Sequence, residues 1–209
     1  AVQQTILWQL RLPRVLLAMI VGANLALSGA ALQSLLREPL ADPYVLGISG
    51  GAGLGCVLAM WIGAWVPVGA FVGAWCAYGL VKRLATVRGR LSLLHMVLAG
   101  VVCNMIASAF LILIQTFAEP FALRAMFMRL LGNIPALTLS QTSLSFVLSV
   151  CGALPLFYYT AEHAVLGLGY DTAKSLGVHV DRVQWITMLC CTWLVSISVA
   201  LAGLIGFVG

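Results

Sequence analysis

Charged residues are spaced so widely along this chain that they divide it into long uncharged stretches. Lys, Arg, Asp and Glu are all absent from 15–36, 43–81, 91–118, 130–161 and 183–209. A helix that crosses a bilayer needs about 20 apolar residues, and every one of these stretches is long enough. Only 8% of the 209 residues are charged, against roughly 25% in a soluble domain. The chain therefore has too few solvated side chains for a soluble globular fold and is predicted to lie in a membrane.

The second stretch is too long for a single span. Pro67 can open a helix but would disrupt the interior of one, which predicts a break between Gly63 and Pro67. The sequence thus predicts an all-α, polytopic membrane bundle of about six helices. These are expected near 12–36, 45–62, 67–84, 92–117, 141–160 and 184–206.

Basic residues are divided unequally between the two sets of connections. The connections after the first, third and fifth spans hold seven: Arg37, Lys82, Arg83, Arg88, Arg90, Lys174 and Arg182. The opposite set holds four: Arg11, Arg14, Arg124 and Arg129. The positive-inside rule predicts that the richer set faces the cytoplasm. The arginines form no basic stripe, so nucleic-acid binding is not indicated.

Small residues recur at the spacing that lets helix backbones approach closely in lipid. The rows are Gly47, Gly51 and Gly55; Gly69 and Gly73; and Gly22, Ala26 and Ala30. The six cysteines all lie in apolar stretches without a CxxC pair, which predicts reduced core residues and no metal site.

One motif offers an alternative function. Gly47 to Gly51 reads GISGG, a match to the GxSxG nucleophile motif, and suggests a rhomboid-like intramembrane serine protease that uses Ser49. Such an enzyme needs a histidine base beside the serine. None of the three histidines lies in an AHxxG pattern. A secondary transporter is a third class, but it would need ionisable residues in mid-span.

The connection before the last span is unusually polar. Residues 168–175, LGYDTAKS, superficially resemble a phosphate loop. The two positions where that loop needs glycine are Leu168 and Ala173, so any ATPase would be a separate subunit. The same residues fit one or two helical turns bounded by Gly169 and Gly177. A short amphipathic helix of this kind either lies on the membrane surface or fits a partner's groove, and composition leaves both open.

Two further segments have both a structural and a functional interpretation. Arg11 and Arg14 precede or open the first span, where they either snorkel to lipid headgroups or bind an acidic external partner. The connection 37–43, REPLADP, carries two prolines four apart and is predicted to be a rigid turn. Such a turn is also suited to the mouth of a pore.

The segment 11–55, from RLPRVLLAMIVGANLALSGAALQSLLREPLADPYVLGISG to GAGLG, resembles the permease subunits of the FecCD family. LGYDTAKSLGV at 168–178 and the ALAGLIGFVG ending agree with it. Such subunits belong to type II ABC importers of iron–siderophore, haem or cobalamin, and a complete subunit has about ten spans. The resemblance implies one transmembrane permease domain, 1–209, incomplete at both ends. It also implies a bacterial inner-membrane location and no catalytic residue, metal or cofactor in this chain.

The resemblance implies partners as well. Two ATPase subunits would bind from the cytoplasm, a second permease would complete the pathway, and a periplasmic or lipoprotein substrate-binding protein would deliver the cargo. Arg11 and Arg14 match the outward arginines that dock the binding protein. Glu38, Pro39 and Leu40 match the cytoplasmic gate region, with Glu38 where the family commonly has Asn. The implied ATPase coupling segment comprises Leu168, Gly169, Ala173, Leu176 and Gly177.

Overall fold

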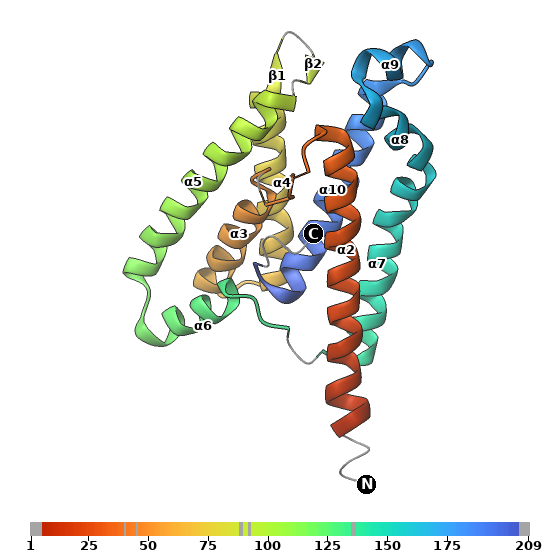
Figure 1. Ribbon diagram of the computed structural model, residues 1–209. Helices are drawn as coiled ribbons and strands as arrows, with labels where there is room; N and C mark the ends of the chain where they lie inside the picture. The colour runs from red at the N-terminus through yellow and green to blue at the C-terminus, as the bar shows by residue number, and fades with distance from the viewer. Residues whose placement is uncertain are drawn as a thin grey trace.

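The computed structural model describes residues 6–39, 41–44, 46–87, 90–91, 93–134 and 137–204, which form a bundle of helices (Figure 1). The elements are η1 (Ile6–Arg11), α2 (Leu12–Leu36), α3 (Ile48–Ile62), α4 (Val66–Ala85), β1 (Thr86–Val87), β2 (Arg90–Leu91), α5 (Leu93–Phe117), α6 (Pro120–Leu130), α7 (Leu139–Tyr158), α8 (Thr160–Leu168), α9 (Tyr170–Ser175) and α10 (Val180–Ala202). The strands form one antiparallel pair, with Thr86 opposite Leu91 and Val87 opposite Arg90. The predicted helical architecture is confirmed.

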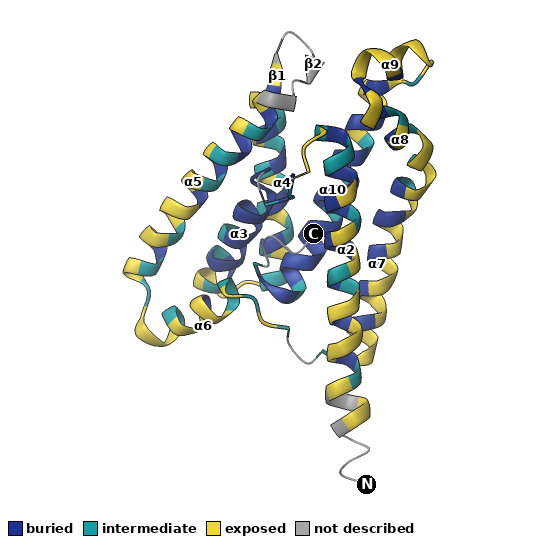
Figure 2. Cartoon of the chain, viewed as in Figure 1, coloured by how far each residue is buried: buried dark blue, intermediate teal, exposed yellow. Residues whose placement is uncertain are grey.

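Each predicted span corresponds to a helix, namely α2, α3, α4, α5, α7 and α10. Four of them, α2, α5, α7 and α10, are long and apolar enough to cross a membrane. The predicted break is confirmed, because α3 ends at Ile62, Gly63 has a φ of 75° and Pro67 lies in the first turn of α4. The apolar side chains that α5 and α7 expose along their outer faces are those expected to contact lipid (Figure 2).

The helix α3 has only 15 residues because the chain before it is irregular. In Figure 1 this segment runs from the end of α2 down into the bundle, where α3 begins. Ala41, Pro43 and Leu46 are buried there. Irregular backbone is tolerated at membrane depth where surrounding protein covers it. The burial of these three residues shows that the bundle covers this irregular segment.

Glycines form the contact between α3 and α4, which we call the glycine seam (Gly51, Gly55, Gly69 and Gly73). A Cβ on Gly51 would lie 2.7 Å from the carbonyl oxygen of Gly73, and a Cβ on Gly73 would lie 2.9 Å from the Cα of Gly55. The close helix packing predicted for these residues is confirmed.

The third small-residue row behaves differently. A Cβ on Gly22 would meet nothing within 4 Å, and Ala26 and Ala30 are exposed. The prediction of close packing was wrong for this row within the described residues. The helix α2 packs instead through a face that includes Leu17, Leu25 and Leu32, because these larger side chains bury more apolar surface.

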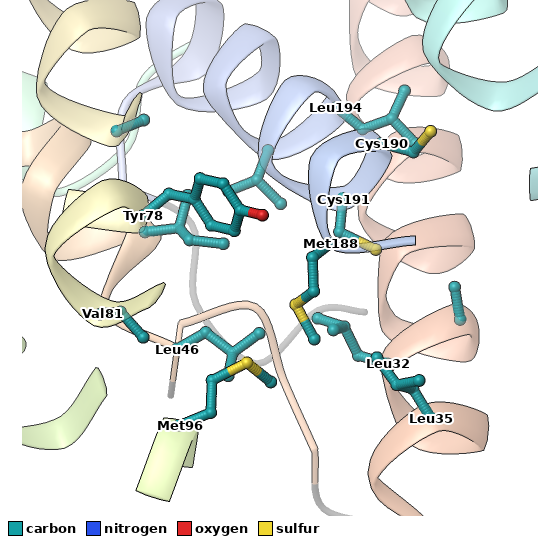
Figure 3. Close-up of a cluster of buried hydrophobic side chains, with 14 of the residues drawn as sticks. Leu32, Leu35, Leu46, Tyr78, Val81, Met96, Met188, Cys190, Cys191 and Leu194 are labelled. Atoms are coloured by element: carbon teal, nitrogen blue, oxygen red, sulfur yellow. The ribbon is translucent and has the colours of Figure 1, made fainter. Parts of the chain in front are cut away.

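The largest buried cluster draws residues from α2, α3, α4, α5 and α10. Figure 3 shows Leu32 and Leu35 facing Met188 and Cys191, with Tyr78, Val81 and Met96 on the other side. Polar groups also join helices in the interior. The Nδ2 of Asn24 donates to the Oγ of Ser149 at 2.8 Å, and the Nε1 of Trp193 donates to the Leu148 carbonyl at 3.0 Å.

The cysteines are only partly as predicted. Cys56, Cys103, Cys190 and Cys191 are buried core residues and all six cysteines are free thiols. Cys76 and Cys151 are exposed on the surface of the chain, so their assignment to the core was wrong. Cys151 is exposed on α7, and Cys76 on α4 lines a hollow between α3, α4 and α5. The apolar pattern alone could not separate these positions from core positions.

The helix α10 is the most buried of the candidate spans and ends at Ala202, before the predicted boundary at 206. Its last carbonyl groups are bound by a segment that the sequence did not predict to be helical. The Arg129 guanidinium on α6 donates to the carbonyls of Ala200 and Leu201, and the Asn133 amide donates to Ala202 at 2.8 Å. A cation at a helix C-terminus stabilises the exposed carbonyl dipoles. Gly203 follows with a φ of 81°, which turns the chain out of the helix.

Candidate functional site

Most of the residues singled out from the sequence lie at one end of the bundle, together with the β1–β2 hairpin (Figure 1). The segment from Thr160 to His179, here called the α8–α9 connection, forms two short helices there. Gly169 separates them with a φ of 145°, and Gly177 ends α9 with a φ of 82°. The predicted turns bounded by these glycines are confirmed.

The end of α9 is held by two backbone hydrogen bonds. The Gly177 amide donates to the Lys174 carbonyl at 3.1 Å, and the Val178 amide donates to the Ala173 carbonyl at 3.0 Å. This is the Schellman pattern, and it requires the left-handed backbone that glycine adopts most easily. A six-residue helix that would be unstable alone thereby acquires a defined end.

The side chains of the connection fall into an inner and an outer set. Ala173 is fully buried, whereas Leu168 and Leu176 are 71% and 64% exposed. Asp171 and Lys174 are exposed as well, so the connection presents both apolar and charged side chains to its surroundings. Hollows of about 470 and 320 Å³ flank the chain after α9, and Gly177, Val178, His179 and Arg182 line both.

His163 ties α8 to α10. Its Nε2 lies 2.7 Å from the Oγ1 of Thr187, which itself donates to the Val183 carbonyl at 2.7 Å. Burial lowers the pKa of His163, while a hydrogen bond to the Tyr159 backbone and the nearby Glu162 carboxylate act in the opposite direction. Burial is the larger of these effects, so the pKa of His163 lies below its ordinary value.

The proline-containing connection after α2 lies at the same end, and we call residues 38–44 the gate turn. The Ala41 amide donates to the Glu38 carbonyl at 3.0 Å, and the Nε2 of Gln33 donates to the Pro39 carbonyl at 3.0 Å. Glu38 and Pro39 are exposed, and Leu40 lies outside the described residues. The predicted turn is confirmed for the residues that the structure describes.

The turn also contacts α5. The Nδ2 of Asn104 donates to the Tyr44 carbonyl at 2.5 Å, and the Tyr44 amide donates to the Oδ1 of Asp42 at 2.7 Å. The gate turn is therefore held by α2 at Pro39 and by α5 at Tyr44.

Arg11 and Arg14 lie at the other end of the bundle, at the start of α2 near the chain's N-terminus (Figure 1). Both side chains are exposed. The structure therefore separates the two arginines from the gate turn and the α8–α9 connection by the length of α2.

The residues considered for a protease site lie on different helices, Ser49 on α3 and His163 on α8. Within the described residues, no group of three or more His, Cys, Asp or Glu side chains gathers at one place. Ser49 is buried in the first turn of α3, and the ring of His163 is bonded to Thr187.

Comparison with known proteins gives a consistent result. Residues 1–209 match the FecCD transport family. This chain belongs to that family. The vitamin B12 import system permease protein BtuC of Klebsiella pneumoniae is 36% identical over 214 residues, which cover 99% of this chain and 63% of that protein. The BtuC protein of Serratia proteamaculans is 35% identical over 216 residues, with the same coverage.

Two solved structures share the fold of this chain. A protein assigned as a metal-chelate type ABC transporter, in an inward-facing conformation, superposes with a TM-score of 0.91 at 30% identity. The match covers 98% of this chain and 67% of that one. PsaBC from Streptococcus pneumoniae shares the fold with a TM-score of 0.58 at 18% identity. The protease alternative that uses Ser49 is not supported by family membership.

The chain spans about 63% of the length of these curated relatives. It is a membrane-embedded FecCD-family chain whose described helices pack as those of an ABC transporter permease do.

Proposed function

We propose that this chain is the transmembrane permease part of an ATP-driven type II importer that moves a metal chelate across a bacterial inner membrane. The cargo class is iron–siderophore, haem or cobalamin. The observation that carries the proposal is the likeness to the inward-facing metal-chelate type transporter, with a TM-score of 0.91 over 98% of this chain. The vitamin B12 import relatives add support for a chelate of this size.

The proposed mechanism assigns different tasks to the two ends of the bundle. Exposed Leu168 and Leu176 enter a groove on an ATPase subunit, and Gly169, Ala173 and Gly177 give the connection the shape that this contact requires. ATP binding and hydrolysis on that subunit then move the α8–α9 connection. Movement of the gate turn, which includes Glu38, Pro39 and Leu40, opens and closes the cytoplasmic mouth of the pathway.

At the opposite end, the exposed guanidinium groups of Arg11 and Arg14 pair with carboxylates of a periplasmic or lipoprotein binding protein. A second permease subunit completes the pathway, and the exposed helix faces contact lipid. The chemistry of ATP hydrolysis belongs to the ATPase subunits, so the permease acts as the moving, non-enzymatic component.

Reconstituted transport tests the proposal. The complete permease, its ATPase and its binding protein are placed in proteoliposomes, and uptake of cyanocobalamin, haemin and ferrichrome is measured with and without ATP. ATP-dependent accumulation of at least one chelate is expected. Absence of uptake for all three, in vesicles whose ATPase is active, would contradict the proposed function.

A variant of the permease tests the coupling assignment in the same vesicles. Ala173→Trp places a large side chain at a fully buried position of the connection and is expected to abolish uptake while the ATPase still hydrolyses ATP. Leu154→Trp on the exposed face of α7 is the matched control and should transport normally.

A further inference from the structure

The residue that joins α2 to the gate turn has an unusual backbone. Arg37 is the C-cap of α2 with a φ of 53° and a ψ of 35°, and it is the one non-glycine residue with positive φ in the described part of the chain. A left-handed backbone is unfavourable for a residue with a Cβ, and asparagine or glycine is the usual choice at a helix end. Something other than backbone preference therefore accounts for arginine at this position.

The side chain of Arg37 reaches the α8–α9 connection, 129 positions away in sequence. Its Nε donates to the carbonyl oxygen of Leu166 at 3.2 Å. That carbonyl lies in the last turn of α8, where unpaired carbonyl groups carry partial negative charge and attract a cation. The same oxygen accepts the Gly169 amide at 3.1 Å, so the guanidinium bonds to the atom that organises the bend between α8 and α9.

Gly169 itself lies close to the guanidinium. A Cβ built on Gly169 would be 3.8 Å from the Nη1 of Arg37. The arginine thus lies against Gly169, a residue of the proposed coupling segment. A displacement of α9 that changes the backbone at Gly169 would change the position of the guanidinium as well.

The other end of Arg37 is continuous with the gate turn. Its backbone is bonded directly to Glu38, whose carbonyl accepts the Ala41 amide, and the following Pro39 carbonyl is held by Gln33 on α2. Hydrogen bonds at Glu38 and Pro39 therefore hold the backbone that directly follows Arg37.

We propose that Arg37 is a positioning residue that links the α8–α9 connection to the gate turn, so that movement at Gly169 changes the backbone of the gate. This inference rests on the proposed function and adds a residue and a contact to it. Arginine suits this role because its planar guanidinium offers several fixed donors on a long side chain.

Substitution by glycine separates coupling from stability. In Arg37→Gly the left-handed backbone becomes favourable, so the fold is retained or stabilised, while the contact with Leu166 is lost. In the reconstituted complete transporter, the ATP hydrolysed per cyanocobalamin, haemin or ferrichrome imported is expected to rise about fivefold or more. Arg37→Lys keeps the cation and should recover part of the coupling.

Two further variants complete the experiment. Arg83→Ala removes an exposed arginine from the last turn of α4 and should leave the ratio of hydrolysis to uptake unchanged. Arg37→Asn tolerates the left-handed backbone but is too short to reach Leu166, so it replaces Arg37→Gly if that variant fails to fold.

The outcomes distinguish this inference from the proposed function. If the wild-type transporter imports none of the three chelates, the proposed function fails and the role of Arg37 fails with it. If the wild type imports a chelate and both Arg37→Gly and Arg37→Asn keep its ratio of hydrolysis to uptake, the link through Arg37 is wrong and the proposed function stands.

Discussion

Glycine has different physical roles in the glycine seam and in the α8–α9 connection. In the seam, a Cβ on Gly73 would meet backbone atoms of α3, which cannot move without separating two helices. In the connection, a Cβ on Gly177 would meet nothing within 4 Å, and glycine is favoured there because of its φ of 82°. The seam is thus built for fixed packing, whereas the connection is built for a defined shape on an open surface. Substitutions should affect stability in the first region and partner binding in the second.

The largest effect is expected in the seam. Gly73→Ala should destabilise the protein by about 3 kcal/mol, because the added methyl group meets the backbone of Gly51 and Gly55. Gly79→Ala is the matched control on the same helix, since a Cβ there meets nothing within 4 Å. Thermal unfolding of the two variants in detergent measures the difference. Equal stabilities would show that the backbones of α3 and α4 are not in contact.

A smaller effect, confined to binding, is expected in the connection. Leu176→Glu should weaken association with the ATPase subunit about 30-fold, because a charge replaces an apolar side chain proposed to be central to the contact. Leu131→Glu alters another exposed leucine, at the opposite end of the bundle, and serves as the control. Affinity is measured with purified ATPase and permease in nanodiscs. If both variants bind as the wild type does, Leu176 does not contribute to the interface.

Arg11 and Arg14 provide a third test, in which the expected effect on binding is smaller and depends on salt. Reversal of Arg11 and Arg14 to Glu should weaken binding of the substrate-binding protein about tenfold, with a larger loss at low salt. Arg124→Glu reverses an exposed arginine on α6 and is the control. Unchanged docking and uptake at physiological salt in the double variant would show that these two arginines do not dock the binding protein.

The smallest effect concerns pH. His163 has a pKa below its ordinary value of 6.5, so the folded state binds fewer protons than the unfolded state does, and stability falls as pH drops below 6.5. His163→Gln keeps a donor for Thr187 but does not titrate, so its unfolding temperature should change less between pH 7 and pH 5. Identical pH profiles for the two proteins would mean that His163 is not buried against α10.

The sequence predicted the features that depend on local composition. The lengths of the uncharged stretches predicted where the spans lie, and Pro67 predicted the break after Ile62. Gly169 and Gly177 bounded α9 as expected, because a change of backbone hand is a local requirement.

Features that depend on distant contacts were not predictable in this way. The helix α6 was missed because Arg124 and Arg129 interrupt its apolar pattern, and the reason for Arg129 lies 71 residues away at the end of α10. The hydrogen bond between Arg37 and Leu166 is likewise invisible in either local segment. The outward orientation of Ala26 and Ala30 could not be read from their spacing, because the spacing is the same for an inward row.

The central claim is that the α8–α9 connection is the surface on which the ATPase acts. Photocrosslinking tests it most directly, with a benzophenone amino acid in place of Leu176 in the complete transporter and in place of Leu131 as the control. We predict a crosslink to the ATPase subunit from position 176, altered by ATP, and none from position 131. A crosslink from position 176 to lipid alone would contradict the claim.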